Sequence, residues 1–315
     1  MKLEEVGKLS AEIEKQFALA GNEGVQAHLK AIGFEPGRFY QELEMSSRYV
    51  DTHQDISASN SQVSLHSHNF CEILCCQNTC DVEYLVGAER YRLQKGDVVI
   101  IPPGVSRRPL LPENMTEPYR RDVMWLSQEF IGSVPIFPTE PQLLRTAGTR
   151  WEFIAEMFRS GVRESEQRQL GWDQAVLGNS IQIVVNIRRA LEDRTAAPMH
   201  VEQPELLDRV LAYVEEHLAQ KITLADVAKH FWVSQSTITQ TFRNKMGVSF
   251  YRCVTQRRLI AAKTLIIEGA PLESVGRKVG FSDYSSFYRA FKQEFGISPR
   301  QFRKKQESVE HAPIM

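Results

Sequence analysis

The sequence predicts an α+β chain of several domains, with a β-rich N-terminal part and an all-helical C-terminal part. Its 315 residues suffice for two or three domains. Short apolar runs separated by turn residues occupy about 46–135, whereas beyond residue 205 apolar residues are spaced three or four apart, as in amphipathic helices. Charge divides the same way: 205–306 holds 17 basic and 9 acidic residues, against 21 and 30 elsewhere. A basic helical part joined to an acidic part is typical of a nucleic-acid-binding module with a partner domain.

The first 45 residues are expected to form a helical extension. Apolar residues lie on one face of its start, and Gly33, Pro36 and Gly37 then end the run. Three roles are consistent with this segment: an extra dimer element, an arm over a pocket, or neither.

Residues 46–135 are expected to form a small barrel or jelly roll. Strand-like runs such as 82–86 and 98–101 are separated by turn residues at Gly87, 95–97 and 102–104. Many short strands at near-regular spacing favour this architecture.

Residues 136–194 return to helical spacing and are expected to pack on the barrel or to dimerise. Leu177, Val184 and Leu191 recur every seven residues, which suits a seam between two helices. Packing against the chain's own barrel explains so short a stripe nearly as well. Residues 195–204, with two prolines and no periodicity, predict a linker to the helical domain at 205–306, and 307–315 would be a tail.

The five cysteines are consistent with a reducing compartment. Cys76 and Cys80 could hold a metal or form a redox pair, but buried free thiols are the favoured interpretation. The sequence contains no signal-peptide layout and no segment apolar enough to span a bilayer. We therefore expect a cytoplasmic protein that does not contact a membrane.

An apolar pattern that occurs twice, 48 residues apart, is the strongest signal in the chain. Leu224, Val227, Phe231 and Val233 recur as Leu272, Val275, Val279 and Phe281, and Ile238 and Phe242 recur as Phe287 and Phe291, with one extra residue in the second turn. Ser234 in one copy, and Ser282 or Asp283 in the other, can cap the second helix of each unit. Each copy therefore predicts a helix-turn-helix, and two copies predict a protein that binds double-stranded promoter DNA.

The polar face of each second helix supplies the candidate DNA contacts. Gln240 and Arg289 occupy equivalent places and are the strongest candidates for base contact, because Gln can pair with adenine and Arg with guanine. Arg243 and Lys292 are expected to contact phosphates. A capping or solvated role is an equal alternative for each Ser or Thr. Trp232 occupies the turn position that Gly280 holds in the second copy. We interpret it as a lid on the small core in preference to a DNA contact. The remaining candidate contacts are Ser236, Thr239, Tyr284, Ser285 and Tyr288.

These motifs resemble a known family. Residues 205–305 are similar to the DNA-binding domain of AraC-type transcription regulators, through Leu224-x-x-Val-Ala, Arg258-Leu-Ile-Ala-Ala-Lys, Val279-Gly-Phe-Ser-Asp and Gly296-Ile-Ser-Pro. Residues 60–126 resemble, less strictly, the cupin-like sensor barrel that often precedes it. The resemblance implies one connecting helix at about 250–267 and two recognition helices in successive major grooves. Expected partners are promoter DNA and a small-molecule effector, with a homodimer and RNA polymerase as further partners.

The sensor half contains a metal-like motif, His66-x-His68-x-x-x-Glu72. In cupins this spacing supplies three metal ligands, but Arg107 stands where a fourth histidine is expected, and a guanidinium cannot ligate a cation. A three-ligand iron site remains an alternative. The preferred interpretation is a pocket in which His66, His68, Glu72 and Arg107 bind a small polar molecule, a sugar or a carboxylate, without a cofactor. In a third alternative, Glu72 and Arg107 pair with each other and the histidines are half exposed.

The sequence thus predicts a ligand-responsive, DNA-binding transcription regulator that is not an enzyme. The alternatives are a cupin-type metalloenzyme fused to a DNA-binding domain, and a regulator whose barrel serves only to dimerise.

Overall fold

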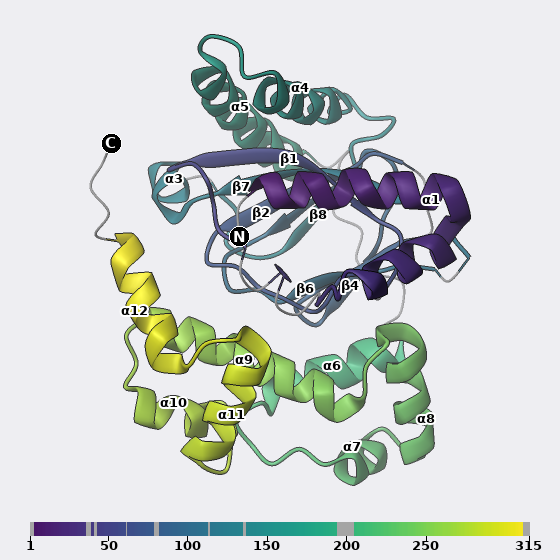
Figure 1. The fold of residues 1–315 in the computed structure, drawn as a ribbon, viewed down its shortest axis with the longest axis vertical. Coiled ribbons are helices and arrows are strands. Elements are labelled where there is room, and N and C mark those ends of the chain that lie inside the picture. Colours follow the sequence, from purple (N-terminus) through teal and green to yellow (C-terminus); the bar gives the residue numbers. More distant parts are fainter. Residues whose placement is uncertain are drawn as a thin grey trace. The chain divides into compact units, whose positions relative to one another are not determined.

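The chain divides into two compact units, Met1–Glu202 and Gln203–Met315, in the computed structural model (Figure 1). The structure describes residues 3–35, 39–40, 43–60, 62–78, 82–112, 114–134, 137–193 and 205–310, the last six of these by their backbone alone. The predicted linker at 195–204 lies outside the described residues, as does Cys80.

The N-terminal unit begins with a long helix, α1 (Leu3–Ala31), that is broken at Ala20 and Gly21. Gly21 has φ +58, a conformation that glycine adopts without strain. Val6 and Ile13, on the predicted apolar face, are buried, as are Val25 and Leu29 after the break. The helix packs against the first strand of the larger sheet.

The described residues of the N-terminal unit include eight strands, which form two separate sheets. The larger, antiparallel sheet has the order β1 (Val50–Ser57), β7 (Tyr119–Leu126), β2 (Cys71–Cys76), β5 (Val98–Ile101) and β8 (Gln142–Leu144). The smaller has the order β4 (Glu89–Arg92), β3 (Glu83–Val86) and β6 (Arg107–Leu110). Among the described residues these strands close no barrel, because the β1 side packs against helices α1 and α4 (Phe153–Gln167) instead of a further strand.

The larger sheet is buried on both faces. Leu74, Val99 and Trp125 belong to one apolar cluster with residues of β3 and β4, and Ile73, Ile100 and Met124 belong to a second cluster with α4 and α5 (Trp172–Glu192). This double burial explains continuous apolar runs such as Val98–Ile101. A short helix, α3 (Gln128–Ser133), follows β7.

The seven-residue stripe on α5 packs within the chain. Val184 is buried in the cluster on the larger sheet, and Leu177 and Leu191 pack against the same cluster. The stripe therefore serves as an intramolecular contact, which favours the second of the two interpretations of its spacing.

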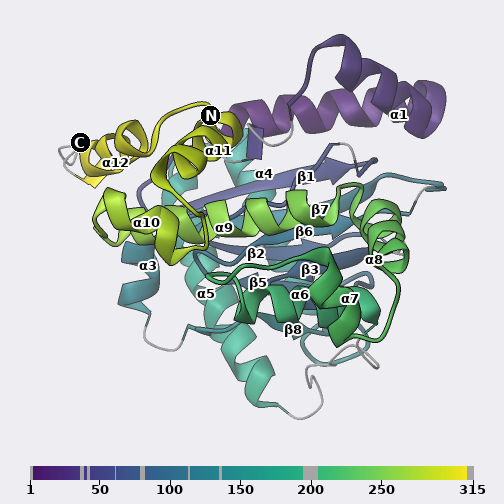
Figure 2. The same cartoon turned by 90° about the horizontal axis from the view of Figure 1, so that it is seen from below.

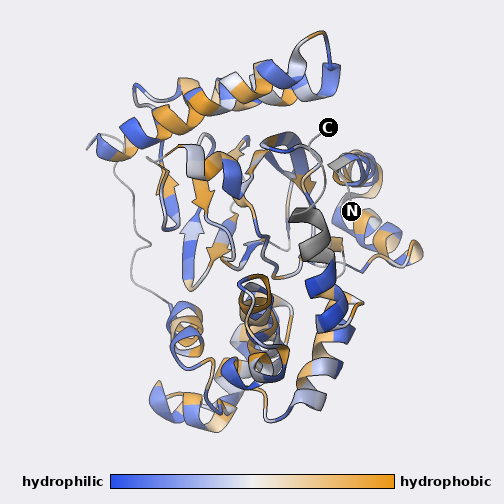
Figure 3. Ribbon diagram, turned by 90° about the vertical axis from the view of Figure 1, so that its left-hand side faces the viewer, coloured by the Kyte–Doolittle hydropathy of each residue, from blue (hydrophilic) through white to orange (hydrophobic). Residues whose placement is uncertain are grey.

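The described cysteines are buried and form no disulfide with one another: Cys71, Cys75, Cys76 and Cys253. Burial raises the pKa of Cys75 well above its ordinary value, so it stays protonated. The helices in Figure 3 carry both hydrophobic and hydrophilic residues along their length. Accordingly, no helix among the described residues is long and apolar enough to cross a membrane.

The described part of the C-terminal unit, residues 205–310, contains helices and no strand. Its elements are α6 (Leu206–Glu216), α7 (Leu224–His230), α8 (Gln235–Thr241), the π-helical turn η2 (Phe242–Met246), α9 (Phe250–Ile267), α10 (Leu272–Lys278), α11 (Tyr284–Phe295) and α12 (Pro299–Glu310). Figure 2 shows α9 running from the side of α8 to the side of α10 and α11. Helix α12 extends into the segment expected to be a tail.

The two predicted helix-turn-helix units are α7–α8 and α10–α11. Side chains of the repeat point inward in both copies: Val227, Ile238, Phe242, Val275, Val279, Phe287 and Phe291 are buried. Ser234 accepts a hydrogen bond from the amide of Thr237 (3.0 Å), and Asp283 accepts one from the amide of Ser286 (2.7 Å). The extra residue of the second turn is Ser282, which places the cap one position later.

Candidate nucleic-acid interface and effector pocket

Helix α8 exposes most of the predicted contact residues while its apolar side is buried. Gln240 and Arg243 are exposed, and Arg243 lies on the π-helical turn rather than on α8 itself. The hydroxyl of Ser236 lies 2.6 Å from that of Ser234, and Thr239 donates to the carbonyl of Gln235 (2.9 Å). Both hydroxyls thus have a hydrogen-bond partner within the helix or at its cap.

Helix α11 presents a larger polar face. Tyr284, Ser285, Arg289 and Lys292 are exposed, and Tyr288 is partly exposed. At its N-terminus, hydrogen bonds from the amide and hydroxyl of Ser286 lower the pKa of Asp283 to about 2. The carboxylate of this cap is therefore ionised, and its negative charge interacts favourably with the positive end of the helix dipole.

Polar residues of α9 connect it to α11, to α7 and to the α6 segment. Glu294 on α11 lies 2.6 Å from Arg252 and accepts a hydrogen bond from Gln256 (3.1 Å). Tyr251 accepts a hydrogen bond from the amide of Leu224, the first residue of α7 (3.1 Å). At the α6 segment, Arg258 donates to the carbonyls of Leu218 (3.1 Å) and Gln220 (2.6 Å), and buried Arg257 pairs with Glu215.

Trp232 does not cover the core, so its interpretation as a lid is wrong. Its side chain is 94% exposed, and its backbone has φ +57. Phe231, the preceding residue, packs instead against Tyr213 and His230. The left-handed turn directs consecutive side chains to different sides, so the smaller phenyl ring packs inward and the indole points to solvent.

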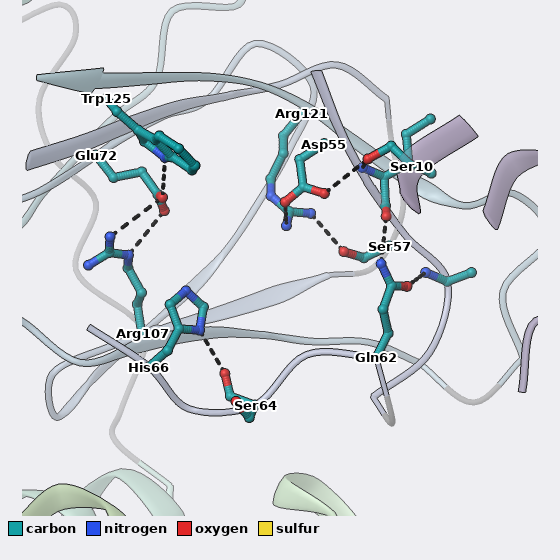
Figure 4. A network of polar contacts seen from close by, with 12 residues as sticks. Ser10, Asp55, Ser57, Gln62, Ser64, His66, Glu72, Arg107, Arg121 and Trp125 are labelled. Atoms are coloured by element: carbon teal, nitrogen blue, oxygen red, sulfur yellow. Dashed lines mark hydrogen bonds and ion pairs between the residues drawn. The ribbon is translucent and has the colours of Figure 1, made fainter. Parts of the chain in front are cut away.

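The four predicted pocket residues are all buried, and three of them, His66, His68 and Glu72, line one small cavity. The fourth, Arg107, lies beside Glu72 (Figure 4). His66 makes an isolated bridge with Arg107, His68 lies in the following loop, and Glu72 lies on β2. Arg107 pairs with Glu72 (Nε to Oε1, 3.1 Å). The Glu72–Arg107 alternative therefore describes the structure, except that the histidines are buried rather than half exposed.

Glu72 is not placed to bind a metal. Its Oε2 accepts a hydrogen bond from Nε1 of Trp125 (3.0 Å), and its Oε1 accepts from Arg107. In the described part of the chain no group of three His, Cys, Asp or Glu side chains could hold a metal ion. The three-ligand alternative of His66, His68 and Glu72 is thus corrected: the carboxylate is already engaged by two donors.

A second buried polar group lies beside it and was missed by the sequence analysis. Asp55 on β1 pairs with Arg121, its register partner on β7, and Ser57 accepts a hydrogen bond from Arg121 (3.0 Å). Ser10 of α1 donates to Asp55 (3.3 Å). The signal in the sequence was weak, because residues 51–55 of β1 are all polar and do not alternate with apolar residues.

His53, on the same face, is buried against the edge of Trp125, with ring centroids 4.6 Å apart. Burial lowers its pKa to about 3, and the charge of Arg121 acts in the same direction. Its Nδ1 has no hydrogen-bond partner among the described residues. A buried imidazole of this kind is neutral and can hydrogen-bond a ligand.

These groups surround a small cavity. His53, His66, His68, Glu72, Asp55 and Arg121 line it, together with Tyr40, Tyr84, Trp125 and the apolar Val6, Leu43 and Val123. Arg107, which pairs with Glu72, is not part of this lining. The free space is about 10 Å³, close to what one water molecule needs. A larger ligand therefore requires the wall to move.

Comparison with known proteins identifies the helical unit. A helix-turn-helix domain family matches residues 227–305, from within α7 into α12. The chain is 34% identical over 134 residues to the probable transcriptional regulator LumQ of Photobacterium leiognathi, covering 42% of this chain and about half (53%) of that protein. It is 25% identical over 220 residues to the arabinose operon regulatory protein of Salmonella typhimurium, covering 68% and 77%. Residues 227–305 therefore contain a helix-turn-helix domain, and the chain is similar to bacterial regulatory proteins that include the arabinose operon regulatory protein.

Among solved structures, the C-terminal domain of AraT, a response regulator from Geobacillus stearothermophilus, is 28% identical, with a TM-score of 0.32, covering 32% of this chain and 86% of that one. The stretch matched by the helix-turn-helix domain family contains α8, α9 and α11, whereas the whole N-terminal unit lies outside it.

Proposed function

We propose that this chain regulates transcription by binding promoter DNA with both helix-turn-helix units. One observation carries the proposal: two capped helices, each with a polar outer face, are joined by α9 in a single compact unit. Two such helices fit successive major grooves about 34 Å apart. Relatives named as transcription regulators support it.

Within this proposal, Gln240 and Arg289 read bases, and Arg243 and Lys292 contact phosphates. Arg289 and Lys292 both lie on α11, are exposed and are about one helical turn apart, so they form a matched pair for a test. Arg289→Ala should weaken binding by roughly 1–3 kcal/mol and relax preference at one base position, whereas Lys292→Ala should weaken all sequences about equally.

The test is a binding titration with a duplex selected from a random library by the wild-type protein, and with single-base variants of it. If both substitutions lowered the affinity equally for every duplex, the assignment of Arg289 to bases and Lys292 to phosphates would be refuted. Failure of the wild-type chain to bind DNA at low ionic strength would refute the function.

The N-terminal cavity is the proposed effector site. Three imidazoles and two acids provide hydrogen bonds, and aromatic rings provide flat surfaces. Because Arg121 is neutralised by Asp55 and Arg107 by Glu72, an uncharged polyhydroxy compound fits these groups better than an anion. The arabinose operon regulatory protein among the relatives supports a sugar-like effector.

A second candidate is a regulator that needs no effector, and the small cavity favours it. Thermal-shift screening with neutral sugars and with sugar acids discriminates the two candidates. A raised melting temperature with a neutral sugar supports the effector site. The second candidate is supported if no compound changes the melting temperature and if reporter output is the same with and without each compound.

We also propose that the chain forms a homodimer, contacts RNA polymerase and acts in the cytoplasm. The α5 stripe gives the dimer no support, because it packs within the chain.

A further inference from the structure

Two unusual features coincide at the turn between α7 and α8. Trp232 has φ +57, in the left-handed region that residues with a Cβ rarely adopt, and its side chain is almost fully exposed. Left-handed backbone is strained for such a residue, and a solvated indole gains no burial energy. Packing within the unit therefore does not explain why a tryptophan stands here.

The equivalent turn of the second copy shows which feature belongs to the repeat. Gly280 has φ +94, so the left-handed conformation is shared. A Cβ at Gly280 would overlap the carbonyl oxygen of Leu218 and lie 2.8 Å from Nε of Arg258. That turn faces the interior of the unit and requires glycine. The first turn faces solvent, where glycine would relieve the strain, and yet the chain places an indole there.

The neighbours of the indole suit a nucleic-acid partner. Ser234, two residues further on, caps α8, and the N-terminal end of a recognition helix is the end that enters the groove. Lys229 and His230, in the last turn of α7, are exposed. The positive charge of Lys229 beside an exposed ring matches a phosphodiester backbone, to which the indole offers one N–H donor and a flat face.

We infer that Trp232 is a DNA contact outside the recognition helix, and that its indole lies on the sugar–phosphate backbone at the edge of the groove that α8 reads. The inference rests on the proposed function, since it requires DNA binding. The left-handed turn directs the ring away from the core of the unit and toward that backbone.

Trp232 can be observed on its own in the full chain. The other tryptophans, Trp125, Trp151 and Trp172, belong to the N-terminal unit, where the first two are buried and the third is half-buried. Subtracting the emission of a Trp232→Phe variant from that of the wild type isolates the Trp232 component. With a saturating duplex of roughly 30 base pairs, long enough for two turns of about 10.5 base pairs, its acrylamide quenching should fall toward that of the buried indoles.

A substitution tests the same contact by affinity. Trp232→Gly should weaken binding of the selected duplex about tenfold, which corresponds to about 1.4 kcal/mol. Its melting temperature should not fall, because glycine adopts this backbone without strain, as Gly280 does. Phe153→Ala removes another exposed ring, in the N-terminal unit, and should leave the affinity unchanged.

The outcomes of these experiments distinguish a failure of the Trp232 contact from a failure of DNA binding. If the wild type binds the duplex while the quenching of Trp232 and the affinity of Trp232→Gly are both unchanged, the inference is overturned and the proposed function stands. If the wild-type chain binds no duplex at low ionic strength, both are overturned.

Discussion

Asp55 and Arg121 show how much depends on single side chains in the N-terminal unit. Both are buried, and Ser10 and Ser57 complete their hydrogen bonding. Removing two charges from water is costly, and their attraction offsets this cost only while both partners remain. Loss of one partner should therefore have a larger effect than loss of a surface ion pair.

Asp55→Asn keeps the shape of the side chain but leaves the buried guanidinium without its counter-charge. The free energy of unfolding of the N-terminal unit should fall by roughly 3–5 kcal/mol, as measured by urea denaturation of the full chain. Glu129→Gln is the matched control, because Glu129 pairs with Arg48 at the surface, and it should change little. Similar losses for the two variants would contradict a buried pair.

His53 makes the stability depend on pH. Its pKa is about 3 in the folded chain and about 6.5 when unfolded, so between these values the unfolded chain binds more protons. The contribution of His53 is fully present above about pH 6.5 and is lost as the pH falls toward 3.

A His53→Gln variant should lack this loss. From pH 6.5 to pH 4, the wild type should lose stability relative to the variant by at most about 1.4 kcal/mol per pH unit, as measured by denaturation at each pH. Parallel curves for the two proteins would show that His53 titrates normally in the folded state.

At the scale of elements, the repeat was predictable because its signals are local. Apolar spacing and a capping residue specify each short helix within a few positions, so the burial of Ile238 and Phe287 and the caps at Ser234 and Asp283 were all expected. The direction of Trp232 was not predictable from spacing, since it depends on one backbone dihedral. The π-helical turn after α8 had no counterpart in the apolar pattern either.

The turn before α11 is the most constrained junction between elements. Gly280→Ala combines a strained φ with a clash against Leu218 and Arg258, and should lower the free energy of unfolding of the C-terminal unit by at least about 2 kcal/mol. Gly269→Ala is the matched control, because Gly269 has φ +83 with open space around it, and it should cost about 1 kcal/mol from strain alone. Thermal denaturation of both variants measures the difference, and equal losses would show that the close contact is not rigid.

At the scale of the whole molecule, the sequence predicted a β-rich part followed by a helical one, but not how the strands associate. Short runs identify strands, whereas their grouping into two sheets depends on pairings between distant residues. The cavity shows the same limit: Asp55 meets Arg121 across 66 positions, and neither motif nor spacing connects them.

The pairing of Glu72 has a consequence for how such chains respond to added metal. Its partners, Arg107 and Trp125, come from 35 and 53 positions further along, beyond the reach of any short signature. A divalent cation that entered this interior would have to displace the guanidinium of Arg107 and the indole of Trp125 before it could contact a carboxylate oxygen of Glu72. The buried Arg107 would then have no counter-charge, which is costly. Untagged protein should consequently pass through a chelating resin charged with nickel without being retained by this motif.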